Sequence, residues 1–193
     1  PGEFTEMRDV IINSQNKNII EILDREAILE YQLDGSFVKR TQIDFPAFSF
    51  ASDNNNYWFY IGNNPSFSQF KLLQTDNNFR KKEEYFAIAE KGIPLIENNF
   101  GIGSYLTYKE SLNPQLYILN DKIKKSYFID FGKFKLPEDI ESYDPFQMAD
   151  KLEKTEYIAI NTYLENNDYT FLFVMKYTPN EPLPNFYYWI INK

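Results

Sequence analysis

The sequence predicts an all-β protein, a β-propeller of four-stranded antiparallel blades with one short helical insertion. Two observations predict this fold. Short apolar runs alternate with polar turns along nearly the whole chain of 193 residues, and one turn pattern recurs at a regular spacing. Aromatic residues, which favour strands, make up 18% of the chain.

The recurring turn lies between the third and fourth predicted strands of each group. Residues 33–40 align with residues 75–82 at an offset of 42, and residues 119–125 form a weaker third copy. A period of about 40–45 residues with four strands per unit is typical of propellers and does not fit helical solenoids. An ordinary β-sandwich stays open as the alternative, but its strands need not repeat a turn at a constant spacing.

Each predicted strand is an apolar or alternating run bounded by turn residues. The clearest hairpin is Asp34-Gly35, because a tight two-residue turn needs positive φ angles. The expected strands are 8–12, 19–24, 27–33 and 37–43; 48–52, 57–62, 68–75 and 79–87; 94–98, 103–110, 115–119 and 124–131; and 157–164, 169–177 and 186–191. We therefore expect one partial propeller domain over residues 1–193, with blades at about 1–43, 44–87, 88–132 and 155–193 and an insertion at 133–154.

The insertion interrupts the strand pattern and predicts a short helix. Asp144 is placed as its N-cap and Pro145 as its first helical residue. Because so short a helix is marginal alone in water, Phe146, Met148 or Leu152 is expected to pack against the propeller. The insertion is then a wall or lid beside the channel, or alternatively a decoration without a ligand.

Composition excludes several classes of function. The net charge is −8, which makes nucleic acid an unlikely partner, and no apolar run is long enough for a transmembrane segment. The chain has no cysteine and no histidine, so disulfides, Cys-ligated zinc and the commonest general base are excluded. We expect no cofactor and no resident metal. An enzyme would have to use carboxylates, lysine, tyrosine or a bound hard cation.

Two side-chain groups have alternative interpretations. The acidic residues near the insertion are calcium ligands or a solvated loop, and the loop is preferred because an EF-hand register is missing. The aromatic runs 57–60 and 187–189 are stacking platforms or blade core, and core is preferred because alternation sends only half of each run to either face. The acidic residues are Asp130, Glu138, Asp139, Glu141 and Asp144.

Several stretches resemble NHL-repeat propellers. Residues 1–4 resemble the second half of the Gly-x-Gly-Pro-Gly-Glu-Phe stretch that opens blades in that family, and residues 20–38 resemble its D-x-G-x-F blade pattern. Residues 127–137 are similar to a segment typical of the exported six-bladed β-propeller lipoproteins of Bacteroides-type bacteria. The resemblance implies six blades, about four of them in this chain, and an extracytoplasmic location. It also implies a leader peptide and a lipobox cysteine, so we expect the chain to be a fragment.

Strand parity places ligand binding on one face. The loops that join strand 2 to strand 3, and strand 4 to the next blade, share a face and here include the longer connections. We expect a protein, peptide or carbohydrate ligand and a non-catalytic binding or scaffolding role. The alternatives are a lyase, lactonase or glycosidase that uses carboxylates or calcium, and a purely structural module. The candidate contacts are Arg25, Asn63, Asn64, Lys109, Tyr143 and Glu181, with no catalytic or metal-binding residue assigned.

Overall fold

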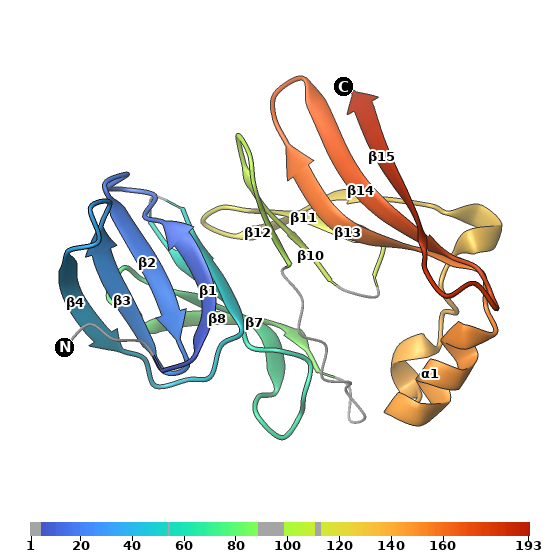
Figure 1. Cartoon of the computed structure of the whole chain (residues 1–193), viewed down its shortest axis with the longest axis horizontal. Helices are drawn as coiled ribbons and strands as arrows, with labels where there is room; N and C mark the ends of the chain where they lie inside the picture. Colours follow the sequence, from blue (N-terminus) through green and yellow to red (C-terminus); the bar gives the residue numbers. More distant parts are fainter. Residues whose placement is uncertain (1–4, 54, 89–98, 111–112) are drawn as a thin grey trace. The chain divides into compact units, whose positions relative to one another are not determined.

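The computed structural model describes residues 5–53, 55–88, 99–110 and 113–193. These residues form four antiparallel sheets, one α-helix and two short 3-10 helices (Figure 1). The all-β prediction is therefore confirmed. The chain divides into two compact units, the first with the two sheets of residues 7–87 and the second with the two sheets of residues 100–192. The predicted blade limits and single-domain organisation stay predictions.

Within each of the two sheets of the first unit, every strand pairs with its neighbours in the sequence. The short connections favour this order, since tight turns join antiparallel strands. The hairpin at Asp34-Gly35 forms, and the Ser36 amide donates to the Asp34 carboxylate at 2.8 Å. It is not the predicted two-residue turn, because its loop spans residues 33–36 and Gly35, at a φ of 86°, has a positive φ whereas Asp34 does not. The two sheets contain β1 (Met7–Ile12), β2 (Ile19–Asp24), β3 (Ala27–Gln32) and β4 (Phe37–Gln42), and β5 (Ser49–Ser52), β6 (Tyr57–Tyr60), β7 (Phe70–Thr75) and β8 (Lys81–Ala87).

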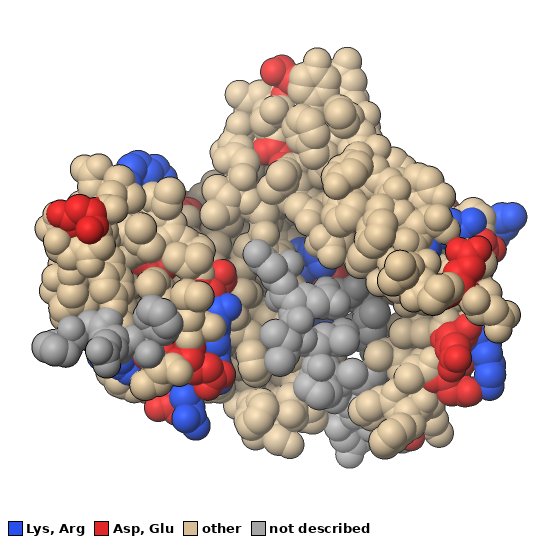
Figure 2. Space-filling model, viewed as in Figure 1, with Lys and Arg blue, Asp and Glu red and all other residues tan. Residues whose placement is uncertain are grey.

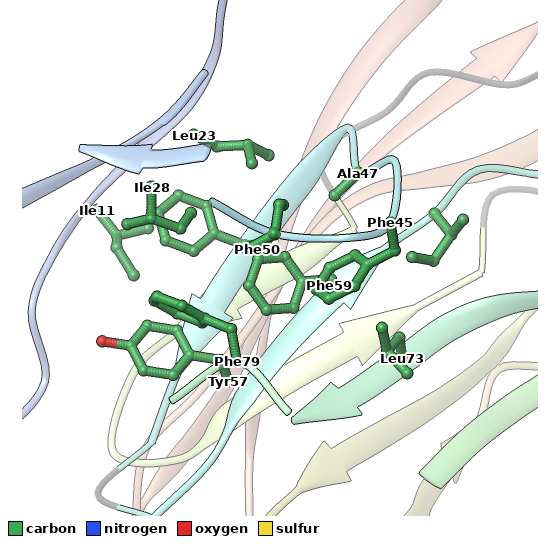
Figure 3. Close-up of a cluster of buried hydrophobic side chains, with 12 residues drawn as sticks. Ile11, Leu23, Ile28, Phe45, Ala47, Phe50, Tyr57, Phe59, Leu73 and Phe79 are labelled. Atoms are coloured by element: carbon green, nitrogen blue, oxygen red, sulfur yellow. The ribbon is translucent and has the colours of Figure 1, made fainter. Parts of the chain in front are cut away.

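Aromatic side chains fill the core between these two sheets. Phe59 meets Phe45 edge-on at 4.9 Å and stacks with Phe50 at 5.8 Å between ring centroids (Figure 3). Alternation along β6 sends Tyr57 and Phe59 into this cluster, while Trp58 packs against Tyr85. All four residues of the 57–60 run are buried, so their interpretation as core is confirmed.

In the second unit, the strands again pair in sequence order. One sheet packs on the other through an apolar cluster that includes Leu116 and Leu172. Phe131 and Phe134, which lie just after the third sheet, cover part of this cluster. The two sheets contain β9 (Phe100–Ile102), β10 (Leu106–Lys109), β11 (Gln115–Leu119) and β12 (Ile123–Phe128), and β13 (Tyr157–Glu165), β14 (Tyr169–Tyr177) and β15 (Asn185–Asn192).

The start of the third sheet differs from the prediction. The predicted strand 94–98 lies outside the described residues, the first described strand is β9, and β10 begins three residues later than expected. A Cβ on Gly101 would lie 1.9 Å from the carbonyl oxygen of Tyr163, and one on Gly103 would lie 2.3 Å from that of Glu165. Gly101 and Gly103 therefore mark a close backbone approach of β9 to β13. From the sequence alone, a glycine in a strand reads as a residue that weakens the strand.

The outer strand β15 also departs from the prediction. All its 8 residues are exposed, and Tyr188, stacked on Phe173 at 4.8 Å, is 79% exposed. The interpretation of residues 187–189 as core is therefore wrong. Figure 2 shows mostly uncharged surface over β13–β15. Alternation along a strand defines two faces, but whether a face is buried depends on what packs on it.

The insertion contains η1 (Gly132–Phe134), η2 (Ile140–Ser142) and α1 (Pro145–Glu153). The predicted N-cap is confirmed, because the Asp144 carboxylate accepts the backbone N–H groups of Phe146 and Gln147, both at 2.9 Å. Met148 is buried as expected, whereas Phe146 is 88% exposed and does not anchor the helix. No helix in the described part of the chain has the length and apolar character needed to cross a membrane.

Candidate functional site

A pocket of about 840 Å³ lies among the loops of the first unit. Its walls come from the β2–β3 turn, the β4–β5 connection and the β6–β7 loop, with Arg8 added from β1. These three connections are among those that strand parity predicted to share one face. The volume is within the usual range for small-molecule sites.

The β2–β3 turn holds Arg25 in an uncommon backbone conformation, with a φ of 50°. The buried Asp24 anchors this turn, because its carboxylate accepts the amides of Thr5 at 2.8 Å and Glu6 at 2.6 Å. Its other oxygen accepts from Arg40 at 3.1 Å. Burial raises the pKa of Asp24, but these bonds and the Arg40 charge outweigh it and leave the pKa below its ordinary value. An ionised Asp24 thus holds a turn from which the exposed Arg25 borders the pocket.

Arg8 is positioned by contacts on several sides of its guanidinium group. It donates to the carbonyl of Ala47 at 2.8 Å and to the Glu6 carboxylate at 3.0 Å. Its guanidinium carbon lies 5.1 Å from the centre of the Phe48 ring. Among the described residues Arg25 has no comparable ion pair, so the two guanidinium groups of the pocket differ in their availability to a ligand.

The β6–β7 loop begins with a glycine that no other residue can replace without strain. Gly62 has a φ of 99°, and a Cβ there would lie 2.8 Å from the Phe48 ring. Asn63 follows and is only 7% exposed, and its Oδ1 has no hydrogen-bond partner among the described residues. A buried polar atom without a partner costs about 1–3 kcal/mol. This oxygen is also closed to solvent, so a ligand that donates a hydrogen bond removes the cost only if the Asn63 side chain turns toward the pocket.

Asn64 turns the same loop back toward β7. Its side-chain oxygen accepts the amide of Ser66 at 2.9 Å, and its carbonyl accepts the amide of Phe67 at 3.0 Å. This local turn places the Phe67 ring beside the pocket with 59% of the residue exposed. The loop therefore supplies a buried amide and an exposed aromatic ring to one site.

The structure brings three of the six predicted site residues together. Arg25, Asn63 and Asn64 line the pocket, and the other three belong to the second unit. Lys109, near the end of the predicted strand 103–110, was expected to contact a ligand, but it is buried at the end of β10. The Tyr143 hydroxyl donates to Asp139 at 2.5 Å, and the exposed Glu181 accepts from the Asn185 side chain at 3.1 Å. The side chains of Tyr143 and Glu181 thus make hydrogen bonds to residues that are close in the sequence.

The second unit has a smaller pocket of about 330 Å³. The β10–β11 connection contributes Asn113 and Pro114, and the insertion contributes several residues, among them Leu136 and Ile140. Lys109, Tyr143 and Glu181 do not line it. The insertion is thus one wall of this pocket, and its proposed action as a lid stays a prediction.

The acidic residues near the insertion make local bonds. Asp130 accepts the Gly132 amide at 2.8 Å, Glu138 pairs with Lys135 at 2.7 Å, and Asp144 caps α1. The pKa of the exposed Glu138 is lowered mainly by its bond from Lys135. In the ranges that the structure describes, no three acidic side chains converge in a way that would hold a metal ion.

The candidate contacts left out several pocket residues, among them Asp44, Phe67 and Arg8. Asp44 lies in a connection that strand parity placed on the same face as Arg25, and Phe67 directly follows such a loop. Strand parity could therefore have predicted both residues. Arg8 is different, because it lies inside a predicted strand and no local pattern distinguishes it.

Three four-stranded antiparallel sheets and one three-stranded sheet, each made of strands that are consecutive in the sequence, define the chain as a propeller protein. The whole chain, residues 1–193, matches a family described as a 6-bladed beta-propeller, and it belongs to that family. No curated protein matches it. A similar solved structure is the selenomethionine-substituted virginiamycin B lyase from Staphylococcus aureus, at 13% identity and a TM-score of 0.39 over 96% of this chain and 70% of that one. So distant a likeness says nothing about activity.

Proposed function

We propose that this protein is a non-catalytic binding or scaffolding propeller of the bacterial cell envelope, with its ligand site in the pocket of the first unit. One observation carries the proposal: Arg25 and Asn63, from separate loops, line one pocket of ligand size, and the buried Asn63 oxygen has no partner in the described part of the chain. The resemblance to exported NHL-like lipoproteins of Bacteroides-type bacteria supports the location. A protein, peptide or carbohydrate fits the polar and aromatic lining.

Ligand-observed NMR against a mixed library of peptides and oligosaccharides tests this proposal. Binding to the intact chain should weaken in Asn63→Ala and in Arg25→Asn. Asparagine suits the latter position because it tolerates a left-handed backbone while removing the guanidinium. Phe146→Ala, a change at an exposed residue of α1, is the matched control and should leave binding unchanged. Binding that survives both pocket substitutions would place the site elsewhere.

A glycosidase-type activity is the second candidate, because Glu26 and Asp44 both line the same pocket. Glycoside hydrolysis ordinarily uses two carboxyl groups on either side of the scissile bond. If this activity exists, Glu26→Gln and Asp44→Asn should each abolish release of reducing ends from an oligosaccharide while leaving its binding measurable. Absence of product from every bound oligosaccharide would leave the non-catalytic role.

A further inference from the structure

The charged groups that line the pocket of the first unit balance one another. Arg8 and Arg25 are basic, and Glu26 and Asp44 are acidic. Glu6, which pairs with Arg8 at 3.0 Å, lies outside the lining and adds one negative charge behind it. A phosphate or polyanion would meet the two carboxylates, and a polycation would meet the two guanidinium groups. The lining therefore favours a ligand without net charge.

The polar groups of the lining are planar and offer paired hydrogen-bonding atoms. Asn63 and Asn64 each have an amide, with two donors and one accepting oxygen, while Asp44 and Glu26 accept and Arg25 donates. Adjacent hydroxyl groups on a sugar ring both donate and accept at a similar spacing. The buried Asn63 Oδ1 lacks a donor among the described residues, and a sugar hydroxyl donates to it without bringing a charge into the pocket once the side chain turns this oxygen toward the ligand.

An exposed aromatic ring completes the arrangement. One face of Phe48 is taken by the Arg8 guanidinium, but Phe67 is 59% exposed beside the pocket. The face of an aromatic ring is electron-rich and attracts the weakly positive C–H groups of a sugar. Phe67 thus offers a stacking surface next to hydrogen-bonding groups.

The ordinary modes of peptide recognition fit this site less well. Addition of a strand needs an open sheet edge, and an amphipathic helix needs a long apolar groove. Here the walls are turns and loops, with charged and amide side chains between aromatic rings. We therefore infer that the pocket binds an uncharged oligosaccharide, with one ring on Phe67 and hydroxyl groups on Asn63 and Asp44. The inference rests on the proposed function, whose ligand class it specifies.

Isothermal titration calorimetry of the intact chain with malto-, cello-, manno-, xylo- and galacto-oligosaccharides tests it. At least one should bind, with a Kd that changes little between about 0.05 and 0.5 M salt because no ion pair forms. Phe67→Ala should weaken binding about tenfold, the loss of one stacked ring, and Phe67→Trp should restore it. Asn63→Ala should also weaken binding about tenfold. Phe146→Ala is again the control, and circular dichroism should show that every variant is folded.

Three results would overturn the inference. One is tighter, salt-dependent binding of uronic acid oligomers than of neutral ones, which would mean that the site selects an anion. Another is sugar binding with a Kd that neither the Phe67 nor the Asn63 substitution changes. The third is binding of peptides but no sugar with loss in Asn63→Ala, which refutes the carbohydrate class and leaves the proposed function standing. The proposed function fails as well only if no ligand of either kind depends on the pocket.

Discussion

Replacing Tyr57 by phenylalanine tests how the first unit accommodates a buried carboxylate. Glu21 on β2 is fully buried, and one of its oxygens accepts the Tyr57 hydroxyl at 2.5 Å and the Asn13 amide at 2.7 Å. The other oxygen has no partner among the described residues. Phenylalanine would keep the ring, which meets Phe79 edge-on at 4.8 Å. The substitution therefore removes the bond to Glu21 and a longer bond from the Asn13 amide at 3.1 Å, with little loss of packing.

The expected loss in the free energy of unfolding is about 2–3 kcal/mol at neutral pH. A hydrogen bond to a charged group contributes about 1.5–3 kcal/mol, and a neutral one about 0.5–1.5 kcal/mol. The loss should therefore be smaller in acid, at about 1 kcal/mol, because a protonated Glu21 is then the acceptor.

The direction of this pH dependence follows from the pKa of Glu21. Burial raises that pKa, and the bonds from Tyr57 and Asn13 lower it without cancelling the effect of burial. A raised pKa gives stability that is fully present below the unfolded value and is lost as the pH rises through the folded value. Removing the Tyr57 bond raises the folded pKa further. The variant should thus lose stability over a wider pH range, at no more than about 1.4 kcal/mol per pH unit for one proton.

Urea unfolding followed by circular dichroism from about pH 4 to about pH 8 measures this difference. Tyr85→Phe is the matched control, because the Tyr85 hydroxyl donates to Glu83 at the same 2.5 Å but in an exposed position. That change should cost less than about 0.5 kcal/mol at any pH. Equal losses in both variants, or a Tyr57→Phe loss that does not grow with pH, would refute the reasoning.

Three further predictions concern packing, association and the helix. Gly101→Ala should destabilise the second unit by about 1–3 kcal/mol or prevent its folding, because the new Cβ would lie 1.9 Å from the Tyr163 carbonyl oxygen; an unchanged thermal midpoint would contradict the close approach of β9 and β13. Tyr188→Lys combined with Ile190→Lys should reduce concentration-dependent association in analytical ultracentrifugation, since both residues are exposed on the uncharged outer strand β15. An unchanged sedimentation profile would show that the protein does not associate through β15. Asp144→Ala should lower the stability of α1 by about 1 kcal/mol through loss of the N-cap, whereas Asp144→Asn should restore most of it; equal melting of the two variants would argue against capping.

The sequence by itself determined the features that depend on neighbouring residues. Most of the predicted strands, the Asp34-Gly35 hairpin and the Asp144 cap are present in the described part of the chain. Each depends on the backbone preferences and hydrogen bonds of a few adjacent residues, so a local pattern contains the information. Parity along the strands was enough to place Arg25 and Asn63 on loops of one face, because alternating strand directions decide at which end each connection lies.

Tertiary structure decided which of these residues are buried and which meet. Lys109 is buried rather than open to a ligand, Tyr188 is exposed rather than in a core, and Arg8 reaches a pocket from the start of β1. Gly101 lies within β9 because a backbone carbonyl of β13 leaves no room for a side chain. Burial and contact are properties of two surfaces at once. The sequence of one strand describes only its own surface, so the partner surface had to come from the folded chain.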